Sequence, residues 1–245
     1  MKKVLITGAN KGVGFETARL LLIQGYYVYL ASRKLSNGLE AVDRLKAEGL
    51  HHVEAVQLDV TDDASVLAAR ASIGAKTQTL DALINNAGIS GSMPQSALDA
   101  DIDQFKKVFD TNVYGVVRVT QAFIDLLRNA PEPRIVNVSS SGCSLTLNSD
   151  PTWKYYSHKA AVYPASKAAM NMYTIDLAYE LRDTPFKVNA VCPGFVATDF
   201  NGHRGTGTVQ EGGERIAKYA MIGNDGPTGQ FFSEDHNPET GVTPW

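Results

Sequence analysis

Short apolar runs and longer amphipathic segments alternate along the chain. Six runs are short and apolar enough for buried strands: Val4–Thr7, Tyr27–Ala31, Val53–Leu58, Ala82–Asn85, Arg134–Val138 and Lys187–Val191. Five segments carry apolar residues at helical spacing: Gly12–Gln24, Asn37–Glu48, Asp62–Ala75, Ile102–Arg128 and Tyr163–Arg182. Gly25 stands where a helix commonly ends, and Thr61-Asp62-Asp63 stands where the next helix commonly starts.

This alternation predicts one α/β domain over residues 1–245. Strands joined through helices form right-handed crossovers, and these place a parallel sheet between two layers of helices. No Pro/Gly/Ser-rich linker divides the chain. The predicted fold is a doubly wound parallel sheet (Rossmann fold), in which ligands bind at the carboxyl ends of the strands.

Two stretches interrupt the alternation. Ser141–Val162 is a polar and aromatic insert, and Asn201–Gly213 is rich in glycine and precedes a short helical pattern at Glu214–Ile222. We expect a substrate lid over about 199–222, and we expect the tail Gly226–Trp245 to fold against the body. The aromatic residues of the insert and lid line a pocket or belong to the core: Trp153, Tyr155, Tyr156 and Phe200.

Composition narrows the function classes. The net charge of −3 gives no sign of a nucleic-acid or anionic-membrane partner. No apolar run approaches the roughly 18 residues of a membrane span, and the apolar stretch before Gly8 is too short for a signal peptide. Two cysteines and five histidines without ligand spacing predict no metal site and a cytoplasmic setting.

A glycine-rich turn follows the first strand. Thr7-Gly8-Ala9-Asn10-Lys11-Gly12-Val13-Gly14 leads directly into a helix. Glycines allow the backbone to approach a pyrophosphate, and the helix N-terminus offers unpaired N–H groups to it. The spacing G-x-x-x-G-x-G differs from the common G-x-G-x-x-G, and steric demands of a tight turn are the alternative explanation.

The end of the second strand indicates NADP(H). NAD sites commonly place a carboxylate there, whereas an arginine accommodates the 2′-phosphate of NADP. Here the strand ends in Ser32-Arg33-Lys34, so Arg33 and Lys11 are candidate phosphate ligands, unless they are ordinary solvated charges. Asp59 follows the third strand and either accepts a hydrogen bond from adenine or serves the next helix N-terminus.

Tyr163 and Lys167 are the candidate proton-transfer pair. Four residues apart on a helix, they share a face, and an ammonium beside a tyrosine favours its phenolate. Tyr155 and Lys159 have the same spacing. A helix from Tyr155 would hold Pro164 in its interior at a cost of about 3 kcal/mol, whereas a helix from Tyr163 holds it in the first turn.

The motifs together resemble those of the short-chain dehydrogenase/reductase family over nearly all of residues 4–200. They are Thr7–Gly14, Asn85–Gly88, Asn112, Ser139-Ser140-Ser141, Tyr163–Lys167 and Pro193–Thr198. The resemblance implies a tetrad of Asn112, Ser140, Tyr163 and Lys167, with Asn112 holding a water that links Lys167 to solvent and Ser139 and Ser141 as lesser candidates. The cofactor-binding residues expected from motif and resemblance are Gly8, Asn10, Lys11, Gly12, Val13, Gly14, Ser32, Arg33, Asp59, Val60, Asn86, Ala87, Gly88, Tyr163, Lys167, Pro193, Gly194, Val196 and Thr198.

The insert separates this chain from most of the family. Gly142–Val162 is longer than the usual spacing between the serine and the tyrosine, which is similar to carbonyl-reductase-like members. Because helices near this insert build the family's subunit interface, we expect a monomer or homodimer rather than a tetramer.

The sequence therefore predicts an enzyme that uses NADPH/NADP+ to reduce a ketone or aldehyde to an alcohol. One alternative is a non-catalytic module that binds NADP(H) and recruits a partner. Another is a sugar-nucleotide epimerase, for which Val191–Trp245 is a short substrate region.

Overall fold

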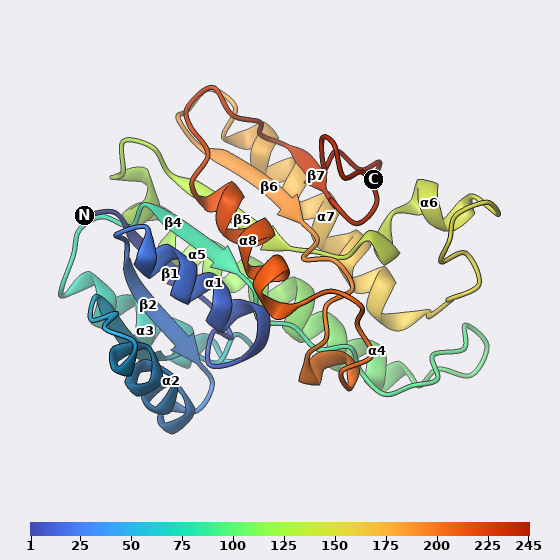
Figure 1. Cartoon of the computed structure of the whole chain (residues 1–245), viewed down its shortest axis with the longest axis horizontal. Helices are drawn as coiled ribbons and strands as arrows, with labels where there is room; N and C mark the ends of the chain where they lie inside the picture. Colours follow the sequence, from blue (N-terminus) through green and yellow to red (C-terminus); the bar gives the residue numbers. More distant parts are fainter.

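A seven-stranded, all-parallel sheet forms the centre of the molecule in a computed structural model that describes residues 1–245 (Figure 1). The strand order is β3 (Val53–Gln57), β2 (Tyr27–Ser32), β1 (Lys3–Ile6), β4 (Ala82–Asn85), β5 (Arg134–Val138), β6 (Lys187–Val191) and β7 (Gln230–Phe232). Six of these strands were predicted, and none of their ends differs by more than one residue. The short edge strand β7 was missed, because three residues are too few to show a period.

Helices cover both faces of the sheet (Figure 1). On one face lie α1 (Gly12–Ile23), α2 (Leu35–Ala47) and α8 (Val209–Ala220). On the other lie α3 (Asp63–Gly74), α5 (Gly115–Arg128) and α7 (Val162–Glu180). Side chains alternate between the faces along each strand, so Val4 and Ile6 pack under α1 while Leu5 packs under α5.

The segment predicted as one helix over 102–128 contains a π-helical turn. α4 (Ile102–Phe109) runs into the π-helix η1 (Asp110–Tyr114), which continues as α5. The N–H of Gly115 donates to the carbonyl of Asp110, five residues back. Such turns insert one extra residue and often mark functional sites, and this one contains Asn112.

A packed helix occupies much of the segment 199–222 that was expected to form a lid. α8 occupies its second half, and Ile216 and Tyr219 of this helix are buried in the core against α1. Residues 199–208, including the 3₁₀ turn η3 (Asp199–Asn201), precede that packed helix, and residues 221–222 follow it. The predicted helix started at Glu214 and the observed one starts at Val209, because Gly212 and Gly213 in its first turns are poor helix formers.

The insert and the tail pack together at one end of the molecule. The insert begins with η2 (Ser141–Cys143) and α6 (Leu145–Ser149) and continues in turns to α7 (Figure 1). The Trp245 ring stacks on Phe231 at 5.6 Å, and a main-chain oxygen of Trp245 accepts hydrogen bonds from Ser144 and Thr146. The tail is therefore folded against the body, as predicted.

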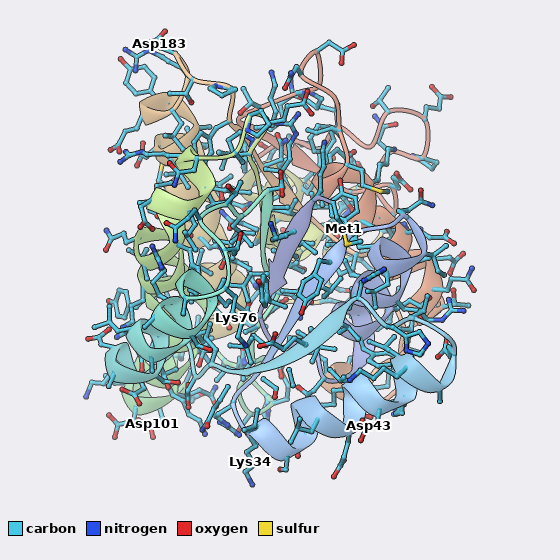
Figure 2. All side chains as sticks on the ribbon, turned by 90° about the vertical axis from the view of Figure 1, so that its left-hand side faces the viewer. Met1, Lys34, Asp43, Lys76, Asp101 and Asp183 are labelled. Atoms are coloured by element: carbon cyan, nitrogen blue, oxygen red, sulfur yellow. The ribbon has the colours of Figure 1, made fainter.

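Charged side chains populate the outside of the molecule. Lys34, Asp43, Asp101 and Asp183 all lie exposed at its margins (Figure 2). None of the helices combines the length and the apolar character that a membrane crossing requires.

Candidate active site

The glycine-rich turn lies at the carboxyl end of β1 and packs against the end of β4. A Cβ on Gly14 would lie 2.4 Å from the Asn86 amide nitrogen, and one on Gly8 would lie 3.0 Å from the Ala87 Cα. Gly12 has φ +60° and no such close neighbour. Packing therefore requires Gly8 and Gly14, whereas Gly12 serves the left-handed turn that leads into α1.

The first turn of α1 suits an anion. Lys11 is its N-cap residue, and no side chain caps the turn or adds an acidic group to it. Its N–H groups and the positive end of the helix dipole thus remain available to a phosphate. A Cβ at Gly88, on the neighbouring loop, would lie 3.6 Å from Lys167 Nζ, so a side chain there would fill the space beside that ammonium. The turn and the loop fit a dinucleotide.

Asp199 is a charged partner of the turn that the sequence analysis missed. Lys11 Nζ lies 2.8 Å from Asp199 Oδ2, and His203 Nε2 lies 2.9 Å from Asp199 Oδ1. The hydrogen bond from Lys11, followed by that from His203, lowers the pKa of the Asp199 carboxyl. The two paired residues lie 188 residues apart in sequence, so no local sequence pattern predicts the pair.

The predicted phosphate ligands differ in availability. Arg33 is exposed at the end of β2 and makes no ion pair or side-chain hydrogen bond. Ser32 is buried, and its hydroxyl donates to the Lys34 carbonyl at 2.7 Å, which turns the chain from β2 into α2. Arg33 is thus a free cation at this end of the site, as is the adjacent Lys34.

Asp59 and Val60 make local contacts beyond the end of β3. Asp59 Oδ1 accepts hydrogen bonds from the Thr61 N–H at 3.0 Å and the Thr61 hydroxyl at 2.7 Å. Val60 packs against the first residue of α5, where a Cβ on Gly115 would come within 2.8 Å of it. The local interpretation of Asp59, as part of a turn before a helix, is supported by these bonds.

The helix of the candidate proton-transfer pair begins where the position of Pro164 predicted. α7 starts at Val162, so Pro164 falls in its first turn. Tyr155 and Lys159 lie in turns of the insert, where the Tyr155 hydroxyl is 3.4 Å from Asp235 Oδ2 and Lys159 donates to the Asn148 carbonyl. The second pair therefore shares no helix face.

Tyr163 and Lys167 stand beside the carboxyl end of β5. Lys167 is 3 % exposed, and its Nζ donates to the Val138 carbonyl at 2.7 Å. Burial lowers the pKa of Lys167 to about 8. Burial raises the pKa of the Tyr163 hydroxyl above its ordinary value, and a hydrogen bond with the Ser140 side chain opposes this rise. At neutral pH Tyr163 is thus a phenol and Lys167 an ammonium, four residues apart on one face of α7.

The three consecutive serines after β5 have different surroundings. Ser139 is buried, and its hydroxyl donates to Asn171 Oδ1 at 2.7 Å. Ser140 is partly exposed, accepts the Gly142 N–H at 3.3 Å and contacts Tyr163. Ser141 opens the 3₁₀ turn η2. The geometry favours Ser140, and Asn171, which the sequence analysis missed, holds its neighbour in place.

Asn112 links the loop after β4 to α7. It is fully buried, and its Oδ1 accepts the Ile89 N–H at 2.9 Å while its Nδ2 donates to the Ile89 carbonyl and to Ser166 Oγ. Ser166 in turn donates to the Tyr163 carbonyl at 2.7 Å. The Asn112 side chain thus connects the loop after β4 to the first turns of α7 near Tyr163. Its expected role of holding a water stays a prediction.

The loop after β6 completes the site. Pro193, Gly194, Val196 and Thr198 follow the strand, and Arg215 of α8 donates to the Pro193 carbonyl at 2.8 Å. Gly194 has φ +88°, and a Cβ there would collide with the Arg215 guanidinium. Arg215 was not predicted, because its role depends on α8 packing beside β6.

The chain is similar over nearly its whole length to proteins named as dehydrogenases and reductases. It is 33 % identical to a (+)-neomenthol dehydrogenase of Capsicum annuum, with 93 % of this chain and 94 % of that protein covered. The structure of salutaridine reductase from Papaver somniferum matches with a TM-score of 0.83 at 30 % identity, covering 95 % of this chain and all of that one. That of an NADPH-bound carbonyl reductase from chicken fatty liver matches with a TM-score of 0.84 at 29 % identity, covering 100 % and 99 %.

A family model described as short chain dehydrogenase matches residues 2–208. With these likenesses it confirms the predicted fold class and the predicted class of enzyme, an oxidoreductase. The chain belongs to the short-chain dehydrogenase family.

Proposed function

We propose that the protein reduces a ketone or aldehyde to an alcohol with NADPH, using Tyr163 as the proton donor. The observation that carries the proposal is the pairing of Tyr163 with Lys167 on α7, beside Ser140 at the end of β5. The likeness to a carbonyl reductase supports this direction of reaction.

The tetrad residues have separate tasks. NADPH, when bound, supplies the hydride. The Tyr163 hydroxyl donates its proton to the carbonyl oxygen as the alkoxide forms, and the Ser140 hydroxyl donates a hydrogen bond to the same oxygen. The raised pKa of Tyr163 keeps it protonated in the resting enzyme, which is the form that reduction requires. The Lys167 ammonium then stabilises the phenolate that remains.

Cofactor recognition divides between two regions. We assign the pyrophosphate to the first turn of α1 and the 2′-phosphate to Arg33, with Lys11 available once it leaves Asp199. Asn86, Ala87 and Gly88 would lie along the dinucleotide. The loop Pro193–Thr198 would hold the nicotinamide end.

The substrate side is apolar. The Phe200 ring of η3 lies 5.5 Å from the Tyr163 ring, and Phe200 and Phe195 are 45 % and 42 % exposed. An apolar carbonyl compound would bury these rings, at roughly 25 cal/mol for each Å² removed from water. We propose residues 199–208 as the substrate lid.

Two variants test the tyrosine assignment. Tyr163→Phe removes the proton but keeps the ring, so kcat for NADPH oxidation across a panel of carbonyl compounds should fall by a factor of at least ~10². The dissociation constant of NADPH, measured by fluorescence, should stay within about twofold. Tyr155→Phe is the matched control and should leave turnover unchanged. Full activity in Tyr163→Phe would remove the assignment, and NADPH binding without turnover of any carbonyl would favour a binding module.

Location and assembly are further parts of the proposal. Both cysteines are free thiols, which supports a reducing, cytoplasmic setting. We propose a monomer or homodimer, and light scattering coupled to size exclusion decides between these and a tetramer.

A further inference from the structure

The catalytic helix α7 begins without a cap of its own. Ala161 is its N-cap residue, adopts a helical backbone conformation and contributes no side-chain hydrogen bond. The first N–H groups of a helix have no partner inside it. Pro164 has no N–H, so three such groups remain here, on Ala161, Val162 and Tyr163.

A single residue from another loop accepts all three. Gln95 lies in the segment between β4 and α4, and it is 4 % exposed. Its carbonyl accepts the Ala161 N–H at 3.0 Å, and its Oε1 accepts the N–H groups of Val162 at 3.2 Å and Tyr163 at 2.9 Å. A glutamine 68 residues upstream of Tyr163 is therefore the cap of this helix.

The other end of the same amide is anchored. Gln95 Nε2 donates to the Ser90 carbonyl at 2.6 Å and to the Ser92 carbonyl at 3.3 Å. Ser90 follows Ile89, the residue whose N–H and carbonyl both bond Asn112. The Gln95 side chain thus joins the loop after β4 to the first turn of α7, next to the second connection through Asn112 and Ser166.

We propose that Gln95 is a positioning residue for Tyr163, an inference that rests on the proposed function. Its side chain holds the N–H of the tyrosine itself, so it fixes the first turn of α7 and with it the direction of the phenol. A displacement of about 1 Å at a reacting group can cost a factor of about 10² in rate. Gln95 touches neither the glycine-rich turn nor Arg33, so cofactor affinity should not depend on it.

Two substitutions at Gln95 distinguish the acceptor oxygen of its side-chain amide from the donor nitrogen. Gln95→Met keeps the length but removes the acceptor and the donor. Gln95→Glu keeps an acceptor for the two N–H groups, favoured further by the helix dipole, and removes the donor to Ser90 and Ser92. Gln104→Met is the matched control, because Gln104 of α4 accepts the Ser92 N–H of the same loop and makes no hydrogen bond to α7.

We expect kcat to fall at least ~10-fold in Gln95→Met, within a range of about 10 to 100, with the dissociation constant of NADPH changed by less than about twofold. Gln95→Glu should keep kcat within about threefold of the parent, and Gln104→Met within about twofold. Hydrogen exchange, which needs no turnover, should show faster exchange at Val162 and Tyr163 in Gln95→Met alone, because the Ala161 N–H keeps the main-chain carbonyl of residue 95 as its acceptor.

The possible outcomes distinguish failure of the positioning role from failure of the proposed function. Unchanged kcat in Gln95→Met, or equal losses in Gln95→Glu and Gln95→Met, would overturn the proposal, because the loop rather than the cap would then matter. Unchanged exchange at the start of α7 would overturn it as well. A parent enzyme that turns over no carbonyl compound would overturn the proposed function instead, and the exchange data would still establish whether Gln95 caps the helix.

Discussion

Burial of the Lys167 ammonium lowers the free energy of unfolding of this protein. It is nearly fully buried with a carbonyl as its hydrogen-bond partner, and burial lowers its pKa to about 8. An unfolded lysine has a pKa near 10.4. The folded state therefore holds the ammonium less favourably than water does, by an amount on the order of 3 kcal/mol at ~1.4 kcal/mol for each pKa unit.

We expect Lys167→Met to be inactive and more stable than the parent at pH 7 without cofactor. The gain should be roughly 1–2 kcal/mol, since the lost hydrogen bond to Val138 offsets part of the burial term. Between about pH 8 and 10.4 the unfolded parent binds more protons than the folded parent, so its stability rises with pH and the difference shrinks. Urea unfolding at pH 7 and pH 9.5 measures both quantities, and a destabilised variant at pH 7 would contradict this explanation.

At the scale of elements, local sequence signals determine some helix boundaries, and long-range contacts determine others. The end of α1 just before Gly25, which has φ +79°, and the start of α3 after the capping Asp62 follow from residues adjacent in sequence. The position of Pro164 decided between two tyrosine–lysine pairs in the same way. The π-helical turn at Asn112 has no such local signal, because it depends on how α4 and α5 each dock.

The start of α8 offers an element-level prediction. Thr208 accepts the Glu211 N–H, and the Glu211 carboxylate accepts the N–H of Thr208, which is a capping box. Thr208→Ala should lower the free energy of unfolding by about 1 kcal/mol. Thr206→Ala serves as the control, because its hydroxyl makes no hydrogen bond and it should have little effect. Urea titration of both variants measures the difference, and equal losses would show that the capping box is not responsible.

At the scale of the molecule, cofactor binding is linked to folding. A ligand that binds only the folded state adds about 2.7 kcal/mol of stability at 100 times its dissociation constant. A domain of this size shifts its Tm by roughly 2–4 °C for each kcal/mol. NADPH at that excess should therefore raise Tm by roughly 5–10 °C.

Arg33→Asp tests the source of that shift. At the same NADPH concentration the rise in Tm should become smaller by several degrees, because a carboxylate would face the 2′-phosphate. We expect NADH to raise the Tm of the parent by less than NADPH does. In Arg33→Asp the rise in Tm with NADH should be unchanged or larger. Differential scanning fluorimetry with both cofactors measures this, and equal NADPH shifts in the parent and in Arg33→Asp would remove Arg33 from the phosphate site.

The sequence by itself determined the class of fold, the central strands and the elements that carry the site. Periodicity and local turn chemistry decide these features, and they act over a few residues. Only the tertiary structure decided how these elements meet: Gln95 caps α7, Asp199 pairs with Lys11, and Arg215 donates to the Pro193 carbonyl. Each of these depends on hydrogen bonds or packing between segments distant in sequence. Their partners become neighbours only once β-strands and helices have docked, so no local pattern contains them.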